Sequence, residues 1–216
     1  MFRKIQEWKP RSIILASGTL KPMKDLEEEL ESKFEVKYES DHVIDSKQMI
    51  CGVISKTLQG SPISFRFSNR GNLKMIKEWG ESIWEIMKSV PDGMLIFFPS
   101  YSLMVKTIFQ WTKFKIIEKM SFYKKIFQET NNSSEFPKLK EEYENHIYYN
   151  SGAVFFSVWR GKVSEGLDFP SRAAQSVIII GVPNANWSSA RVQLKIKYMD
   201  SKKEEDNSKI SGKEKC

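Results

Sequence analysis

The chain has little cysteine, and this scarcity limits the classes of protein to which it can belong. Its 216 residues include two cysteines, Cys51 and Cys216. Two cysteines do not make a disulfide framework, and they cannot hold an iron–sulfur cluster, which needs about four cysteine ligands. Cys51 lies in an apolar run, so we expect it to be a small core residue, whereas Cys216 is expected to be free. This usage indicates a reducing compartment, the nucleus or the cytoplasm.

Other absences concern membranes, metals and nucleotide cofactors. No apolar run approaches the roughly 18 residues of a membrane span, and the N-terminus carries no cleavable signal pattern, so no membrane is expected. His42 and His146 lack companions for a metal site, and none is predicted. No GxGxxG follows a strand-like segment, which argues against an unrelated Rossmann-like small-molecule enzyme. The formal charge of +7, with 34 Lys and Arg against 27 Asp and Glu, is a modest indication of a polyanionic partner.

The apolar residues that are present alternate between two patterns along the chain. Short continuous apolar runs typical of buried strands occupy residues 13–16, 94–98, 153–158 and 176–180. Helical spacing predicts helices over residues 22–30, 73–90, 102–119, 137–148 and 190–199, with 121–129 as a continuation or a second helix. Weaker strand candidates lie at 34–38 and 48–54. This order predicts an α/β fold with a parallel sheet covered by helices on both faces.

The most informative segment follows the predicted strand at 153–158. A dense set of glycines, cations, carboxylates and a hydroxyl occupies one turn there: Arg160, Gly161, Lys162, Ser164, Glu165, Gly166 and Asp168. In α/β sheets, ligands bind just beyond the carboxyl ends of the strands. Glycines allow close approach to a phosphate backbone, and cations supply charge. We therefore interpret this segment as a binding loop; the plainer alternative is an ordinary turn with solvated charges.

Hydroxyl groups follow two other predicted strands in the same way. Ser17, Gly18 and Thr19 follow the run at 13–16, where a plain hydroxyl-rich turn is the alternative. Ser100 and Tyr101 follow the run at 94–98. Ser100 is predicted to cap the next helix, and with the helix N-terminus it is a candidate phosphate contact. Tyr101 either stacks on a base or packs locally. A further aromatic group is predicted to be core rather than a base-stacking platform: Phe109, Trp111, Phe114, Phe122, Tyr123 and Phe127.

Three of these segments resemble helicase motifs in the correct order. The sequence RGKVSEGLDF at 160–169 resembles motif V of the XPD-like helicases, the iron–sulfur branch of superfamily 2, and residues 12–22 and 93–101 resemble motifs III and IV. Segments 41–45 and 90–93 resemble the subgroup that contains the FancJ, Chl and telomere-length-regulating helicases. The resemblance covers roughly residues 10–200. It implies a RecA-like sheet of the P-loop NTPase type, with 1–22 as the end of helicase domain 1, 23–200 as an incomplete helicase domain 2 and 201–216 as a disordered tail.

The resemblance also implies roles for the singled-out residues. The nucleic-acid side would comprise Arg160, Gly161, Lys162, Ser164, Ser100 and Tyr101, and the ATP side Glu165, Gly166 and Asp168, with Asp168 near the ribose. Ser17, Gly18 and Thr19 would couple the nucleotide state to the strand contact. The implied activity is ATP-driven, 5′-to-3′ translocation on single-stranded DNA in the nucleus, with roles in DNA repair and telomere maintenance. ATP and Mg²⁺ would act in the full-length context, and a 4Fe–4S cluster would belong to the N-terminal motor domain.

Several elements of a complete motor are not found in this sequence. There is no GxxxxGK[ST] loop, no Asp-Glu-Ala-His box and no QxxGRxxR segment after the helix predicted at 190–199. We therefore expect that this chain alone does not hydrolyse ATP. Two interpretations stay open: the chain is the domain-2 portion of an XPD-like DNA helicase, or it is a truncated, non-catalytic nucleic-acid-binding or regulatory module.

Overall fold

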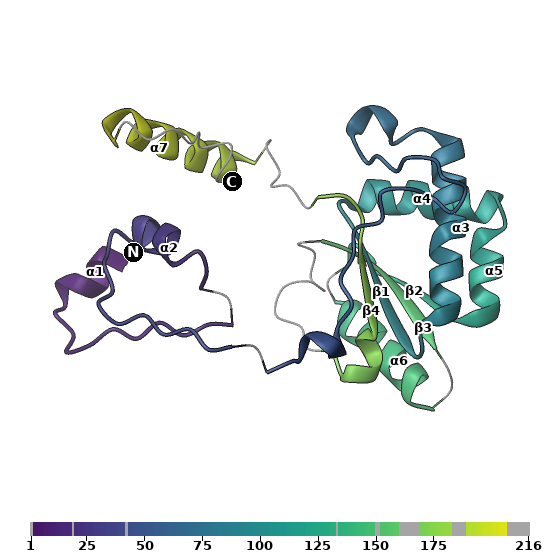
Figure 1. Cartoon of the computed structure of the whole chain (residues 1–216), viewed down its shortest axis with the longest axis horizontal. Helices are drawn as coiled ribbons and strands as arrows, with labels where there is room; N and C mark the ends of the chain where they lie inside the picture. Colours follow the sequence, from purple (N-terminus) through teal and green to yellow (C-terminus); the bar gives the residue numbers. More distant parts are fainter. Residues whose placement is uncertain are drawn as a thin grey trace. The chain divides into compact units, whose positions relative to one another are not determined.

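The computed structural model describes residues 2–18, 20–41, 43–132, 134–149, 152–159, 169–182 and 189–206 (Figure 1). The chain forms two compact units, Met1–Gly52 and Val53–Cys216. Nothing in this division tests whether residues 1–22 end a preceding motor domain, so that assignment stays a prediction.

The second unit is built on a parallel sheet of four strands in the order β2-β3-β1-β4. The strands are β1 (Gly93–Phe98), β2 (Lys125–Gln128), β3 (Ala153–Val158) and β4 (Ser176–Ile179). Every residue of β1 and β3 is buried. Because Gly93 pairs with Ala153 and Phe98 with Val158, the two central strands begin and end side by side. The parallel sheet predicted from the continuous apolar runs is confirmed.

Helices cover both faces of this sheet (Figure 1). Met94, Ile96 and Phe98 of β1 pack into one apolar cluster with α3 (Leu73–Ser89), α4 (Tyr101–Lys113) and α5 (Ile116–Tyr123). Leu95 and Phe97 point to the other face, into a second cluster with α6 (Phe136–Tyr149) and the 3₁₀ turn η3 (Ser171–Ala174). This alternation follows from the two-residue period of a strand. The expected α/β architecture with helices on both faces is therefore observed.

A tryptophan locks the packing of α3 against α4. Trp111 is fully buried, and its indole N–H donates a hydrogen bond to the carbonyl oxygen of Ile76 at 2.9 Å. Its ring lies 4.8 Å from that of Trp79, centroid to centroid. Gly80 lies directly beneath the indole ring, so that a β-carbon at this position would collide with it. Glycine in the middle of α3 is thus required by the close approach of α4.

The segment between α4 and α6 differs from the prediction. The expected single helix over 102–119 is broken at Lys115, whose φ of 58° lies in the left-handed region. The helix suggested for 121–129 is correct only as far as Tyr123, where α5 ends, and it is wrong beyond that point, because residues 125–128 form β2 at the edge of the sheet. Phe127 is buried there against Tyr143 and Phe155. Tertiary contacts with β3 and α6 thus override the helical pattern.

The aromatic residues of this segment are divided between core and surface. Trp111 and Phe127 are buried, as predicted, and Phe114 packs partly against the core. Phe109, Phe122 and Tyr123 are exposed, with 55%, 85% and 47% of their surface accessible. The prediction that the whole group is core is therefore wrong for these three.

The first unit contains α1 (Phe2–Glu7), α2 (Met23–Leu30) and the 3₁₀ turn η1 (Ser46–Gln48), of which α2 was predicted. The described residues of 13–16, 34–38 and 48–54 form no strands, contrary to expectation, and Ile14 is 85% exposed. An apolar run needs neighbouring strands to form a ladder, and none pairs with these segments in the described part of this unit. Cys51 is exposed rather than buried. Cys216 lies outside the described residues.

The C-terminal part corrects two further expectations. Val177 and Ile179 of the edge strand β4 are about half exposed, so the sheet is incompletely covered at this edge. α7 (Ala190–Asp206) continues through residues 201–206, which were expected to be disordered. The lysine and glutamate content of that stretch favours a helix. Residues 207–216 lie outside the description. In the described residues, no helix has the length and apolarity needed to cross a membrane.

Candidate nucleic-acid interface at the carboxyl edge of the sheet

Three strands end together at one edge of the sheet, and the sequence-predicted binding segments follow two of them. The Trp159 N–H donates to the Phe98 carbonyl oxygen at 2.7 Å, which joins the end of β3 to the end of β1. The Glu129 N–H donates to the Phe156 carbonyl oxygen at 2.8 Å, which joins the end of β2 to β3. Segments far apart in the sequence are therefore neighbours at this edge.

Ser100 caps the helix that follows β1, as predicted. Its hydroxyl oxygen accepts a hydrogen bond from the Leu103 N–H at 3.3 Å, and its carbonyl oxygen accepts from the Met104 N–H at 3.0 Å. The N-terminus of α4 thus lies at the carboxyl edge, where its N–H groups and the helix dipole favour a negative charge. Contact of Ser100 with a phosphate stays a prediction.

Tyr101 packs locally in this structure. Its ring contacts the apolar cluster under α3 and α4, and its hydroxyl donates a hydrogen bond to Glu129 Oε1 at 2.5 Å. Burial, followed by the hydrogen bond and the charge of Glu129, raises the pKa of Tyr101 above its usual value. The hydroxyl therefore stays protonated and remains a donor at neutral pH. The proposed contact of Tyr101 with nucleic acid stays a prediction.

Glu129 is a buried carboxylate that sequence reasoning missed. Only 1% of its surface is exposed, and its second oxygen, Oε2, accepts from the Ser157 hydroxyl at 2.5 Å and from the Val158 N–H at 3.0 Å. Its signal in the sequence is weak, because Ile126 and Phe127 are the only apolar residues in the four-residue strand before it. So short an apolar pair is compatible with a helix as well as with a strand.

The residues of the predicted binding loop, 160–168, lie outside the described residues. Arg160, Gly161, Lys162, Ser164, Glu165, Gly166 and Asp168 all fall in this range, so their roles stay predictions. The described residues on either side of the loop are fixed. Trp159 meets Phe97 edge-on at 5.9 Å between ring centroids, and Phe169 meets Tyr143 at 6.1 Å. Both ends of the loop are thus packed against the apolar cluster on the α6 face.

The residues of the predicted coupling motif belong to the first unit. Ser17 and Gly18 are exposed there, and Ser17 lines a hollow together with Leu20 and Phe34. Thr19 lies outside the described residues. Their coupling role stays a prediction.

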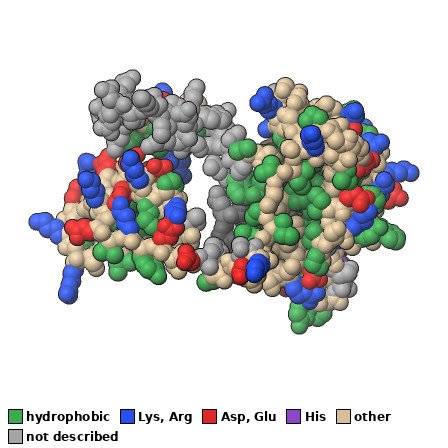
Figure 2. Space-filling model, viewed as in Figure 1, with side chains coloured by type: hydrophobic (Ala, Val, Ile, Leu, Met, Phe, Trp, Pro, Cys, Tyr) green, Lys and Arg blue, Asp and Glu red, His purple; other side chains and the backbone are tan. Residues whose placement is uncertain are grey.

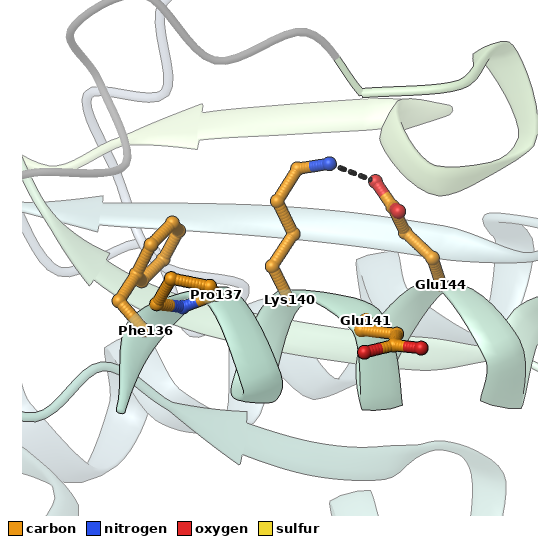
Figure 3. Close-up of a pocket in the computed structure, with 5 residues that line it drawn as sticks. All are labelled: Phe136, Pro137, Lys140, Glu141 and Glu144. Carbon is orange, nitrogen blue, oxygen red and sulfur yellow. Dashed lines mark hydrogen bonds and ion pairs between the residues drawn. The ribbon is translucent and has the colours of Figure 1, made fainter. Parts of the chain in front are cut away.

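A hollow of about 290 Å³ along the first turns of α6 is not suited to a polyanion (Figure 3). Among the described residues that line it, Lys140 is the one cation, and Lys140 Nζ pairs with Glu144 at 2.6 Å. Glu141 adds a second carboxylate to the lining. On the face of the molecule that Figure 2 shows, the Lys and Arg side chains of the described residues are scattered rather than gathered in one large patch.

A charged cluster at the opposite, amino edge of the sheet is structural. The Asp92 carboxylate accepts two hydrogen bonds from the Arg172 guanidinium, each at 3.0 Å, and Lys124 Nζ donates to the Asp92 carbonyl oxygen at 2.7 Å. The hydrogen bond from Arg172 lowers the pKa of Asp92, and burial lowers the pKa of Lys124. These contacts hold the turn before β1 to η3. Within the described ranges, no group of three or more His, Cys, Asp or Glu is arranged to hold a metal ion.

The parallel sheet with helices on both faces is the architecture of a RecA-like helicase domain, and the predicted binding segments follow β1 and β3. The helicase C-terminal domain family matches residues 83–214, and the chain belongs to this family. The chain is similar to proteins named regulator of telomere elongation helicase 1 homolog. It is 41% identical to the one from Oryza sativa subsp. japonica over 201 residues, which cover 88% of this chain and 20% of that protein. It is 37% identical to the one from Drosophila melanogaster over 204 residues, which cover 94% of this chain and 21% of that protein.

These comparisons confirm the resemblance to the XPD-like helicases and, within them, to the subgroup that contains the telomere-length-regulating helicases. The chain spans about a fifth of the length of the curated relatives that it matches. It therefore corresponds to a portion of a DNA helicase of this family.

Proposed function

We propose that the chain forms the C-terminal helicase domain portion of an ATP-dependent DNA helicase that moves 5′-to-3′ on single-stranded DNA in the nucleus. In this proposal the carboxyl edge of the sheet binds the DNA backbone and contributes one side of the ATP cleft. The observation that carries it is the capped N-terminus of α4, which lies at the same edge as the end of β3, the strand that leads into 160–168. The names of the relatives support the proposed role in telomere maintenance, and a role in DNA repair is a further part of the proposal.

The division of labour follows from the chemistry of the residues. Ser100 and the free N–H groups of α4 would receive one phosphate, and Arg160 and Lys162 would supply positive charge to the next. Glu165 and Asp168 would lie towards the nucleotide. If one loop contacts both ATP and DNA, closure of the domains on ATP also changes the contacts of the loop with the DNA strand.

The implied cofactors require a second domain. No described group of residues is suited to a metal, and the proposed ATP-side residues lie outside the described part of the chain. We propose that ATP and Mg²⁺ are held jointly with the N-terminal motor domain, which would also carry the 4Fe–4S cluster, since this chain has two cysteines. That domain and single-stranded DNA are the proposed partners.

A non-catalytic nucleic-acid-binding module is the second candidate. The observation behind it is that no QxxGRxxR segment is found after the helix at 190–199 in this sequence. Both candidates share DNA binding, and they differ in whether the chain acts within a larger motor.

The salt dependence of binding tests the proposal. Fluorescence anisotropy with labelled oligothymidylate should show that affinity falls as salt rises, and Lys162→Ala should shallow the log–log slope by about 0.7, the value for one phosphate contact. Lys88→Ala is the matched control, because it removes the same charge at a different place. Lys88 lies in the last turn of α3, just before β1 and therefore near the amino edge of the sheet. Equal slopes for the two variants and the unmodified chain would contradict a contact between Lys162 and the DNA backbone.

A further inference from the structure

Glu129 stands out as a buried acidic group among the binding segments. We propose that Glu129 is a positioning residue, which holds the start of α4 and the end of β3 in one fixed arrangement. It would thereby set the relative position of the two segments that grip the DNA backbone. This inference rests on the proposed function for its effect on DNA, whereas the structural coupling stands by itself.

Both oxygens of the carboxylate are used, and they bind different elements. Oε1 accepts from the hydroxyl of Tyr101, the first residue of α4. Oε2 accepts from the hydroxyl of Ser157 and from the N–H of Val158, the last residues of β3. The backbone N–H of Glu129 is itself bound to the Phe156 carbonyl oxygen. The residue is therefore fixed at both ends and joins three elements.

A carboxylate is a costly choice for this position if its task were only to fill space. Burying a charged group away from water is unfavourable unless hydrogen bonds compensate. Here the three donors are neutral, and no Lys or Arg in the described residues forms an ion pair with Glu129. An apolar side chain would avoid this penalty, but it would leave the Val158 N–H and the hydroxyls of Tyr101 and Ser157 without their acceptor. What the carboxylate adds is directional contact with two separate elements.

The connected elements are the ones that carry the candidate site. Tyr101 directly follows the cap residue Ser100, and Val158 is two residues before Arg160. A displacement of the carboxylate would therefore move the N-terminus of α4 and the start of the loop together. A buried network with all its members satisfied favours a single geometry, which a phosphate-binding surface requires.

Glu78 provides a matched control within the same unit. It is also largely buried, at 9% exposed, and its carboxylate accepts from the Thr57 hydroxyl at 3.1 Å and lies 3.7 Å from Lys74 Nζ. It thus joins α3 to residue 57 instead of joining α4 to β3. Replacement of either glutamate by glutamine keeps the volume and removes the charge, but places an NH₂ group where a donor must be accepted.

The experiment compares Glu129→Gln with Glu78→Gln in the whole chain by two measurements. Amide hydrogen exchange is followed at Leu103 and Val158, and oligothymidylate binding is followed by anisotropy across a salt series. For Glu129→Gln we expect exchange at both amides to accelerate together, affinity to fall by about tenfold, and the salt slope to shallow by about 0.7 for each phosphate that the chain no longer binds. Glu78→Gln should leave exchange at these amides, affinity and slope as in the unmodified chain. If Glu129→Gln does not fold, Ser157→Ala takes its place. It removes one of the three hydrogen bonds to Glu129, so the same changes in exchange, affinity and slope should be seen at smaller size.

The outcomes separate this inference from the proposed function. If the unmodified chain does not bind oligothymidylate, the proposed function fails, and positioning is decided by exchange alone. Positioning is overturned if the two amides respond independently, or if Glu129→Gln and Glu78→Gln change them equally. The proposed effect of Glu129 on DNA binding is overturned if the unmodified chain binds oligothymidylate and Glu129→Gln accelerates exchange but leaves affinity and salt slope unchanged.

Discussion

Gly80→Ala should destabilise the second unit, because the added methyl group has no room beneath Trp111. Two opposing effects decide how much the free energy of unfolding falls. Alanine in place of glycine inside a helix favours folding by about 1 kcal/mol. Overpacking in a rigid core costs up to about 3 kcal/mol. The upper end applies here, since the Trp111 ring is fully buried and bound to the Ile76 carbonyl oxygen. We therefore expect a net loss of about 2 kcal/mol in the free energy of unfolding.

Urea unfolding followed by tryptophan fluorescence measures this loss. With a slope of about 2 kcal/mol per molar urea, the midpoint should fall by about 1 M. Gly71→Ala is the control, because a β-carbon there meets nothing within 4 Å, and its midpoint should stay near that of the unmodified chain. A second variant tests the cause: Trp111→Phe should make Gly80→Ala less harmful, since the smaller ring leaves space, so the two changes should not be additive. A midpoint for Gly80→Ala equal to or above that of the unmodified chain would refute the reasoning, because it would mean that the indole ring moves aside without cost.

Three further expectations concern the amino edge, the second core and ATP. Because Arg172 lowers the pKa of Asp92, the stability from this pair is present above pH about 4 and is lost as the pH falls through the lowered pKa. Arg172→Ala should therefore lower the urea midpoint at pH 7 and have little effect in strong acid; an equal effect at both pH values would exclude an ionic origin. Tyr143→Phe removes the hydrogen bond from the buried phenol to the Ala173 carbonyl oxygen, 2.6 Å long, and should cost about 1 kcal/mol in thermal unfolding, whereas an unchanged melting temperature would mean that the bond adds nothing. The purified chain with oligothymidylate should release no phosphate from ATP in a colorimetric assay, and sustained release would contradict the need for a second motor domain.

The central strands were predictable from the sequence because their burial is complete. Residues 94–98 and 153–158 are continuous apolar runs, which is how a strand covered on both faces appears. β2 was not predictable in this way, since it is a four-residue strand at the sheet edge in which Phe127 alone is buried. The strand predicted for residues 13–16 is not observed. Its composition suits a strand, but it has no neighbouring strand in the described part of its unit.

Whether a residue of the candidate site could be predicted depends on how far apart in the sequence its contacts lie. The cap by Ser100 involves Leu103, so a local pattern of a hydroxyl before a helix was sufficient to predict it. Glu129 contacts Tyr101 and Ser157, each 28 positions away, and no local pattern records such contacts. They become visible only when the strand order is known.

Strand order also explains why the ends of β1 and β3 lie at one place. β1 and β3 are separated in sequence by α4, α5, β2 and α6, yet they pair in register along their whole length. Parallel pairing places both carboxyl ends at one edge, and the bond from Trp159 to Phe98 fixes them side by side. Under the proposed function, a phosphate backbone that meets the N-terminus of α4 would therefore pass close to Trp159, the last described residue before 160–168. The separation of α4 and Trp159 in the sequence is thus a consequence of the crossover helices, and their proximity is a consequence of the sheet.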